Sequence, residues 1–473
     1  MVIRFLARSP KRTQKTSLSL VLALLITSAI LSTSFIILKA RPLANWDEAI
    51  YAQVAREALA SHSPLAFTWD GNIGLYRPAG WYEKPPLMIW LTETAFSILG
   101  QSELAARIWV LVFSLATVAL SCVWVSGAYG SRAAVLTAAT YLISFQFFRS
   151  SSVLQLDIPV GFFILLSLFA FARARSKPRY FYVFWLSVGL GVMTKSVIGL
   201  LPIPIVMLAA GCVRDAFYLR SRPFYLGILL FLAITMPWHL VEMLRFGKEF
   251  WDQYFLYHLL TRWSTGIESN GQPFSFYWRI LLHQRMLVGL FVPSFAYALY
   301  AVVKRQLDMA LFAAAFVVVM MFFSSSHTKL PWYILPIYPF LAASIGIFLS
   351  SVFEALAPSI ATAMTVVVIV TCAFLGGRHA LYLHHVALAD QAAIEDQALG
   401  TFLASHYPDV AIYDSTTEMK PAVIYYADRV VYRIDEGSPE PKTPFLLIAD
   451  NAPPFRLRNV VLQMRSETLF SSN

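Results

Sequence analysis

The chain carries the segment Asn45-Trp46-Asp47-Glu48-Ala49-Ile50-Tyr51-Ala52-Gln53-Val54-Ala55-Arg56-Glu57 directly after its first long apolar run. This short segment has the pattern of a helix and brings two adjacent carboxylates, a tyrosine, an arginine and a third carboxylate together in largely apolar surroundings. Charges beside hydrocarbon are costly unless they are paired or hydrated, and membrane proteins therefore keep them mainly where they function. The segment is the first candidate for a functional region.

The composition around it is that of an integral membrane protein. Of the 473 residues, 58% are hydrophobic and 14% are charged, whereas about 25% of the residues in a soluble domain are charged. The net charge of +10 arises largely from Lys and Arg in the loops, where they set topology, so we expect no nucleic acid partner. Apolar runs near the roughly 20 residues needed to cross a bilayer predict about eleven spans, at 17–38, 103–127, 131–148, 157–174, 179–195, 196–213, 223–244, 285–303, 309–324, 331–352 and 359–377.

The basic residues before the first span place the N-terminus in the cytoplasm by the positive-inside rule. The segment at Asp47 then lies outside, and an odd number of spans places the C-terminus on the same side. Two helices, from Asp47 to about Ser61 and from Leu87 to Leu99, are too short to span. We predict that both lie along the membrane surface.

The composition changes at about Leu381, where the apolar runs shorten and polar residues return. We predict a membrane domain at 1–380 and a small C-terminal α/β soluble domain at 381–473, on the outer side. The elements predicted within the C-terminal domain are helices at 391–406 and 420–427 and strands at 409–413, 429–434, 444–449 and 459–464.

The ionisable residues outside the basic loops fall on the outer side of this topology. They are Asp47, Glu48, Arg56, Glu83, Lys84, Asp157, Lys195, His258, Arg262, His327 and Lys329. Several also have an ordinary structural interpretation, which stays open. Asn45 could cap a helix with Glu48 completing a capping box, and Asp157 could cap its span. Lys195 could extend its ammonium toward the membrane surface, and His258 could be an interfacial histidine; their joint placement nevertheless favours a shared site.

A site that joins a lipid-anchored donor to an acceptor needs a base for the incoming hydroxyl, cations for the leaving phosphate and an apolar groove. Asp47 suits the base, and two other carboxylates, Glu48 and Asp157, are candidates to stabilise an oxocarbenium-like transition state. The side chains that suit the phosphate are cationic or hydroxylic: Arg56, Lys84, Arg262, Lys329 and Tyr333. The further candidates for contact with donor or acceptor are Tyr51, Tyr82 and Lys195.

Four motifs, taken together and in this order, resemble the bacterial aminoarabinose transferase family. They are Asp47–Arg56, Tyr82–Leu87 (Tyr-Glu-Lys-Pro-Pro-Leu), Thr194-Lys195 and Lys329–Pro336 (Lys-Leu-Pro-Trp-Tyr-Ile-Leu-Pro). This family has the GT-C fold and is related to the protein O-mannosyltransferases. The resemblance implies an inverting transferase of the bacterial inner membrane, with its active site on the periplasmic face and a polyprenyl-phosphate-linked sugar as donor.

The resemblance also implies roles for single residues. Asp47 would match the catalytic acidic residue of the first loop and act as general base, while Arg56, Lys84 and Tyr333 would hold the lipid phosphate. One sugar would move to an envelope acceptor, for which lipid A or a related glycolipid is the first expectation and a protein the alternative.

A divalent metal is a further implication of the resemblance, with Glu83 as a ligand. The family carries a Gln-His pair shortly before Pro-Phe in the large outer loop, where this chain has Ser269-Asn270-Gly271-Gln272-Pro273-Phe274. The family histidine is therefore missing, and a metal site would need His258 as its substitute.

Three other kinds of membrane protein remain as alternatives. A non-catalytic scaffold whose C-terminal domain binds an envelope partner would give no reason for Asp47-Glu48 beside the Glu83-Lys84 pair. A transporter would place ionisable residues near the bilayer midplane and show repeated halves, whereas the charges predicted here lie at span ends on one side. An oligosaccharide polymerase or ligase would share the lipid-linked donor but move a sugar chain rather than one sugar.

Overall fold

The computed structural model describes residues 18–38, 41–62, 65, 67, 71–72, 80–267, 270–434, 440–441, 443–450, 457, 459–464 and 467–472. The basic residues that we used to place the N-terminus lie outside these ranges. The chain forms two compact units, and each is described by itself. We call them the helical unit (Met1–Ile37, Glu83–Leu87 and Trp109–Leu383) and the sheet unit (Leu38–Tyr82, Met88–Ile108 and His384–Asn473).

Eight helical segments among the described residues are long and apolar enough to cross a membrane. They are α5 (Glu103–Tyr129), α8 (Asp157–Ala174), α9 with the 3₁₀ helix η1 (Tyr180–Leu200), α11 (Arg222–Phe246), α15 (Arg285–Val303), α16 (Leu307–Ser325), the 3₁₀ helix η4 with α17 (Pro331–Phe353) and α18 (Pro358–Leu388). The prediction of a polytopic helical membrane protein is confirmed at this level.

The predicted number of about eleven spans is not reached in the described part of the chain. One predicted span is divided: α6 (Ser131–Ile143) ends where Ser144 leaves the helical region, and α7 (Phe145–Ser150) starts anew. The 13 residues of α6 cover about 20 Å at 1.5 Å per residue, less than a hydrocarbon core of about 30 Å. The helix α10 (Pro202–Val213) is shorter still, and α2 (Leu18–Leu38) contributes an apolar stretch at Leu20–Thr33.

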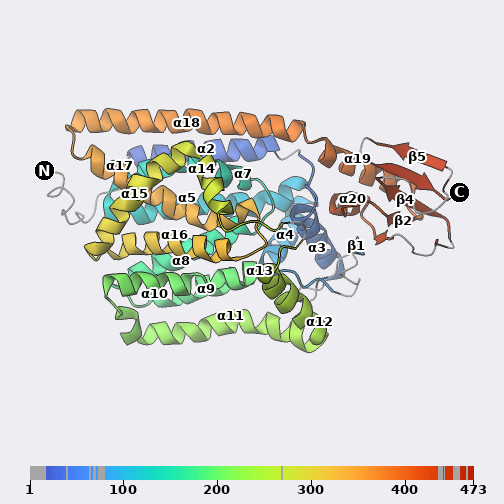
Figure 1. The fold of residues 1–473 in the computed structure, drawn as a ribbon, viewed down its shortest axis with the longest axis horizontal. Helices are drawn as coiled ribbons and strands as arrows, with labels where there is room; N and C mark the ends of the chain where they lie inside the picture. Colours follow the sequence, from blue (N-terminus) through green and yellow to red (C-terminus); the bar gives the residue numbers. More distant parts are fainter. Residues whose placement is uncertain are drawn as a thin grey trace. The chain divides into compact units, whose positions relative to one another are not determined.

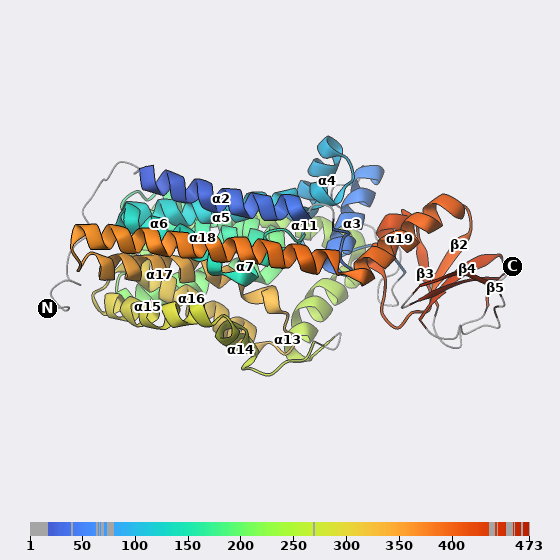
Figure 2. The ribbon, with the colours of Figure 1, turned by 90° about the horizontal axis from the view of Figure 1, so that it is seen from above.

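The helices of the helical unit pack side by side along most of their length (Figure 1). Helix α9 packs against both α8 and α11, and α6 packs against α17. The α6–α17 pair needs Gly346, because a Cβ there would lie only 2.6 Å from the carbonyl oxygen of Ala133. Such small residues let helix backbones approach closely in a membrane. Figure 2 shows α18 running beside α2, and a Cβ at Gly376 in α18 would lie 3.5 Å from Ile30 of α2.

The break between α9 and η1 fixes one edge of the site described below. Helix α9 (Tyr180–Lys195) ends at Lys195, and the next residue, Ser196, adopts a φ of 50° that a non-glycine residue rarely takes. The turn then folds back tightly, since a Cβ at Gly199 would meet the carbonyl oxygen of Gly191 at 2.6 Å. The turn that we predicted between two spans at 195–196 is therefore present, although it continues as the short helix η1 (Ser196–Leu200).

The large loop after α11 is itself helical. It contains α12 (Lys248–Phe250), the π-helix η3 (Trp251–Thr261), α13 (Arg262–Ser264) and α14 (Phe276–His283). These elements carry His258 and Arg262 into the helical unit on a continuous helical path.

The sheet unit combines four helices with a six-stranded mixed sheet. The helices are α3 (Asp47–Ser61), α4 (Leu87–Leu99, from Met88 onward), α19 (Gln391–His406) and α20 (Pro421–Ala427), which agree closely with the predicted ranges. The strand order is β1-β3-β2-β4-β6-β5, with β1, β3, β2 and β4 parallel and β6 antiparallel to both β4 and β5.

Four of the six strands were predicted to within two residues. They are β2 (Ala411–Asp414), β3 (Val431–Arg433), β4 (Phe445–Ala449) and β5 (Asn459–Gln463). The strands β1 (Gly71–Asn72) and β6 (Thr468–Ser471) were not predicted. The proposed boundary at 380/381 stays a prediction; the sheet unit also includes Leu38–Tyr82 and Met88–Ile108.

Candidate active site

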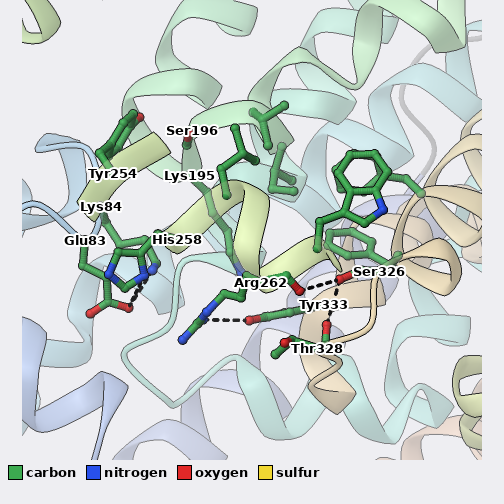
Figure 3. Close-up of a pocket in the computed structure, with 16 residues that line it drawn as sticks. Glu83, Lys84, Lys195, Ser196, Tyr254, His258, Arg262, Ser326, Thr328 and Tyr333 are labelled. Carbon is green, nitrogen blue, oxygen red and sulfur yellow. Dashed lines mark hydrogen bonds and ion pairs between the residues drawn. The ribbon is translucent and has the colours of Figure 1, made fainter. Parts of the chain in front are cut away.

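A pocket in the helical unit gathers five of the eleven ionisable residues that the sequence singled out (Figure 3). Its empty volume is about 730 Å³, including the open space at its mouth. The residues that line it come from the Glu83–Leu87 segment, the α9–η1 turn, η3, α13, α16 and the segment before α17: Glu83, Lys84, Lys195, Ser196, Val197, Ile198, Tyr254, His258, Leu259, Arg262, Trp263, Phe322, Phe323, Ser326, Thr328 and Tyr333.

Two lysine–carboxylate pairs occur at this pocket. Lys84 Nζ lies 2.7 Å from Glu83 Oε1, and Lys195 Nζ lies 2.6 Å from Asp157 Oδ1. The second pair forms because Asp157 begins α8 and Lys195 ends α9, and these two helices pack antiparallel. Each ammonium therefore has a fixed position at the pocket wall while remaining partly exposed.

Arg262 and Tyr333 form the opposite part of the polar lining. Arg262 Nη1 donates a hydrogen bond to the Tyr333 hydroxyl at 3.3 Å, as Figure 3 shows. The Tyr333 ring also faces Lys195, whose Nζ lies 4.5 Å from the ring centroid. This cation–π contact links the α9 end of the pocket to the 3₁₀ helix η4 (Pro331–Ile337).

The electrostatics favour an anion. Burial alone would raise the pKa of Glu83, but the surrounding positive charges, that of Lys84 first, lower it to about 2, so the carboxylate is ionised. Burial lowers the pKa of His258 well below its usual value. The charge of Glu83 opposes this shift and those of Lys84 and Arg262 add to it, so the imidazole is neutral. Three cations (Lys84, Lys195, Arg262) then face two carboxylates, Glu83 and Asp157, which leaves one net positive charge.

An apolar wall completes the pocket. Trp263 follows Arg262 directly, and Phe322 packs against it with ring centroids 5.3 Å apart. Phe323 in turn packs against Tyr333 at 5.4 Å. A ligand with a phosphate group and a hydrocarbon chain would meet both of its needs here, because ionised donors bind phosphate oxygens strongly and aromatic rings cover apolar surface.

Lys329 does not line this pocket. Its buried ammonium donates to the carbonyl oxygens of Gln272 at 2.9 Å and of Ser326. The backbone of the same segment pairs with the loop after α13, through a bridge between Gly271 and Thr328. Lys329 therefore links two loops through its hydrogen bonds, and we do not propose it as a ligand of the phosphate.

The metal that the resemblance implied does not fit the described residues. His258 Nδ1 lies 4.0 Å from Glu83 Oε1, and Lys84 already bonds to that same oxygen. Zinc sites take three or four protein ligands, whereas no group of three His, Cys, Asp or Glu side chains in the described ranges could hold a metal ion. The reaction proposed below therefore assigns no role to a metal ion.

The sheet unit holds the other acidic candidates. Glu48 is buried and accepts four hydrogen bonds, from Arg41 (2.6 Å), from the backbone N–H of Ala44 (3.0 Å) and from Arg107 Nε and Nη2 (2.7 and 3.0 Å). Burial alone would raise the pKa of Glu48, yet Arg107 and Arg41 lower it to about 2. These contacts indicate that Glu48 stabilises the fold of this unit. Its partner Arg107 was not among the residues that the sequence singled out.

Arg56 forms hydrogen bonds and an ion pair within the same unit. Its Nη1 donates to the carbonyl oxygen of Tyr425 and to Asp428 Oδ1, both at 2.7 Å, and its guanidinium lies 3.8 Å above the Tyr425 ring. Tyr51 and Tyr82 are buried here as well, and Tyr51 packs edge-on against Trp81. Asp47 is half-buried at the first position of α3.

The pocket also contains residues that sequence inspection overlooked. Tyr254 is the clearest case, because it precedes His258 by four residues and Arg262 by eight, and this spacing places all three on one helical face. Ser196 was visible only as the neighbour of Lys195. Ser326 and Thr328 carried no signal beyond their closeness to the Lys329 motif.

Comparison with known proteins agrees with the family resemblance that the motifs indicated. Residues 83–240 match the family described as dolichyl-phosphate-mannose-protein mannosyltransferase. The undecaprenyl phosphate-alpha-4-amino-4-deoxy-L-arabinose arabinosyl transferase 1 of Proteus mirabilis is 27% identical over 324 residues, covering 65% of this chain and 56% of that protein. An uncharacterized protein of Aquifex aeolicus is 30% identical over 270 residues, covering 57% and 61%. The matched part of the chain thus spans 56% to 61% of these relatives' length.

The fold is shared with solved membrane proteins. ArnT from Cupriavidus metallidurans, solved with bound undecaprenyl phosphate, superposes with a TM-score of 0.77 at 18% identity, covering 94% of this chain and 97% of ArnT. The archaeal oligosaccharyltransferase AglB from Archaeoglobus fulgidus superposes at 0.59 and 13% identity, covering 87% and 64%. The resemblance that the motifs predicted is therefore confirmed: this chain is a polytopic membrane protein similar in sequence to the aminoarabinose and mannosyl transferases, and it shares the fold of ArnT.

Proposed function

We propose that this chain is a membrane glycosyltransferase, which moves a single sugar from a polyprenyl-phosphate-linked donor to an envelope acceptor. The observation that carries this proposal is the pocket in which Lys84, Lys195 and Arg262 adjoin an aromatic wall. Its one net positive charge suits a sugar phosphate, and its apolar side suits an isoprenoid chain. We place it in the bacterial inner membrane, with its active site facing the periplasm and lipid A or a related glycolipid as acceptor.

The chemistry is a single displacement. Asp47 takes the proton of the acceptor hydroxyl as that oxygen attacks the anomeric carbon of the donor sugar. The new carbon–oxygen bond forms while the bond to the phosphate oxygen breaks, and the phosphate leaves with the bonding electrons. One displacement inverts the configuration of the anomeric carbon.

The pocket side chains act on the leaving group and the sugar. Lys84 and Arg262 stabilise the charge that develops on the phosphate, and Tyr333 adds a hydroxyl held by Arg262. Asp157 fixes the Lys195 ammonium and offers a carboxylate for positive charge on the sugar ring.

An experiment with defined lipids tests this reaction. The full chain in nanodiscs is mixed with undecaprenyl-phosphate-linked sugars and lipid A, and the lipids are analysed by mass spectrometry. We expect lipid A to gain the mass of one sugar while undecaprenyl phosphate is released. No release with any donor or acceptor would contradict the proposal.

Oligosaccharide transfer is the second candidate, because AglB shares the fold. It predicts that a lipid-linked sugar chain is consumed while single-sugar donors are not. The mass added to the acceptor separates the two candidates in the same experiment.

A further inference from the structure

The backbone just before Asp47 is held by side chains at nearly every residue, all within the sheet unit. The carbonyl oxygens of Arg41 and Pro42 accept hydrogen bonds from Arg107 at 2.9 and 3.0 Å. The N–H of Leu43 donates to the Tyr426 hydroxyl at 2.9 Å, and the N–H of Ala44 donates to Glu48. Four consecutive residues are thus held by side chains, and for Arg41, Pro42 and Leu43 the partner lies more than 60 positions away in the sequence.

Asn45, the next residue, makes two side-chain hydrogen bonds. Its Nδ2 donates to Asp396 Oδ2 in α19 at 2.5 Å, and its Oδ1 accepts from the N–H of Ala422 in α20 at 2.9 Å. Since Pro421 begins α20 and has no N–H, Ala422 carries the first backbone donor of that helix. The Asn45 side chain therefore caps α20 while it anchors to α19.

Asp396 is itself held in place. It is 1% exposed, and its Oδ1 lies 3.6 Å from Lys420 Nζ. Lys420 also forms an ion pair with Glu467. The acceptor for Asn45 is therefore part of a buried network within the C-terminal region.

Trp46, between Asn45 and Asp47, has a strained backbone. Its φ is 67° and its ψ is −125°, a conformation that L-residues rarely adopt. Such a strained conformation persists only where the surrounding structure over-determines the chain. The bonds to residues 41–45 on one side and α3 on the other supply that constraint. Without them, Trp46 would relax to negative φ and turn the Asp47 side chain.

We propose that Asn45 and Asp396 are positioning residues for Asp47, through which the C-terminal α/β region holds the strained turn that presents this carboxylate. The proposal rests on Asp47 being the base of the proposed reaction. It gives the C-terminal region a part in catalysis without any contact with substrate.

Exchanging the two side chains provides the test. Asn45→Asp sets two carboxylates against each other across the present 2.5 Å contact. We expect the transfer kcat to fall by roughly 10- to 100-fold, the loss expected when a reacting group shifts by about 1 Å, with donor KM unchanged. The double variant Asn45→Asp/Asp396→Asn restores a donor opposite an acceptor and keeps an oxygen for the Ala422 N–H, so we expect kcat to recover.

The matched control is Arg429→Ala in the same C-terminal region. Arg429 donates to the carbonyl oxygens of Tyr407 and Val410, which lie outside the segment 41–48. We expect this variant to lower the thermal midpoint while kcat stays unchanged. A kcat loss in Asn45→Asp that the double variant does not rescue, or that Arg429→Ala reproduces, would overturn the proposal.

Hydrogen–deuterium exchange separates this proposal from the proposed function. In Asn45→Asp, we expect faster exchange at residues 43–50, returning to the wild-type rate in the double variant. A second outcome is that exchange follows this pattern while Asp47→Asn transfers sugar normally. In that case the proposed role of Asp47 is wrong, although the Asn45–Asp396 contact holds the turn as proposed. If exchange at 43–50 is unchanged in Asn45→Asp, the positioning proposal itself is wrong.

Discussion

Two glutamates, Glu48 in the sheet unit and Glu83 in the helical unit, have the same charge and different surroundings. Opposing cations lower the pKa of both Glu48 and Glu83 to about 2, against the effect of burial. Glu48 is enclosed by Arg41, Arg107 and backbone, and it accepts four hydrogen bonds. Glu83 and its partner Lys84 instead line an open pocket.

We infer from this comparison that an ion pair is a candidate for ligand binding where a cavity adjoins it. In sequence, Asp47-Glu48 and Glu83-Lys84 look equally promising, since both break an apolar stretch. The structure distinguishes them by the presence of a cavity beside Lys84. Variants at each cluster should accordingly affect different properties, stability in the first and ligand binding in the second.

The largest expected effect is on stability. Arg107→Met leaves Glu48 with Arg41 as its remaining cationic partner, and breaking a buried ion pair costs about 3–5 kcal/mol. We expect a fall near 3 kcal/mol in the free energy of unfolding, measured by denaturation in detergent. The double variant Arg107→Met/Glu48→Leu removes both charges and should regain most of the lost free energy of unfolding. A single variant as stable as the wild type would break the comparison.

The next effect is on donor binding. Lys84→Gln keeps a donor for Glu83 and removes the positive charge, and a hydrogen bond to a charged group contributes about 1.5–3 kcal/mol. We expect undecaprenyl phosphate to bind roughly tenfold or more weakly, measured by titration in nanodiscs, with little change in stability. Lys248→Gln is the control, because that ion pair with Asp252 is exposed and outside the pocket. Equal affinities for the two variants would remove Lys84 from the phosphate site.

A smaller effect is expected at Lys329. Because its ammonium bonds to the carbonyl oxygens of Gln272 and Ser326, Lys329→Met should loosen the loops around Arg262. We expect kcat to fall severalfold while affinity for undecaprenyl phosphate changes less than in Lys84→Gln. An affinity loss as large as that of Lys84→Gln would restore the direct phosphate contact that the sequence suggested.

A further prediction concerns the pH dependence of stability. Burial raises the pKa of Asp396 from 3.8 to about 6, although Lys420 opposes the shift. The folded state therefore binds a proton more tightly than the unfolded state, and this stabilisation is present below pH 3.8 and lost as the pH rises through 6. Asp396→Asn should flatten the decline in stability between about pH 4 and 6. Thermal unfolding across that range measures it, and an unchanged slope would contradict the shift.

Local signals predicted the helices well. The charged start of α3, the prolines before α4 and the periodicity of α19 gave those helices nearly to the residue. The charged residues at span ends also pointed to Lys84, Lys195 and Arg262, which meet at one pocket. These features depend on residues near one another in the chain, where pattern and propensity act directly.

Long-range partners could not be predicted in this way. Arg56 meets Asp428 across 372 positions, and Lys329 binds backbone carbonyls that no sequence pattern marks. The division of the predicted 131–148 span at Ser144 depends on packing, since the local composition continues to favour a helix. Side-chain charge was visible in the sequence, whereas the group that each charge contacts was not.

The most direct test of the central claim is the mass of the envelope lipids in cells that express Asp47→Asn, beside wild-type and null strains. Asn is nearly isosteric with Asp but cannot take the proton of the acceptor hydroxyl. We predict that wild-type cells contain a glycolipid one sugar heavier, which both the null and the Asp47→Asn strains lack. The same heavier species in Asp47→Asn cells at the wild-type level would contradict the account.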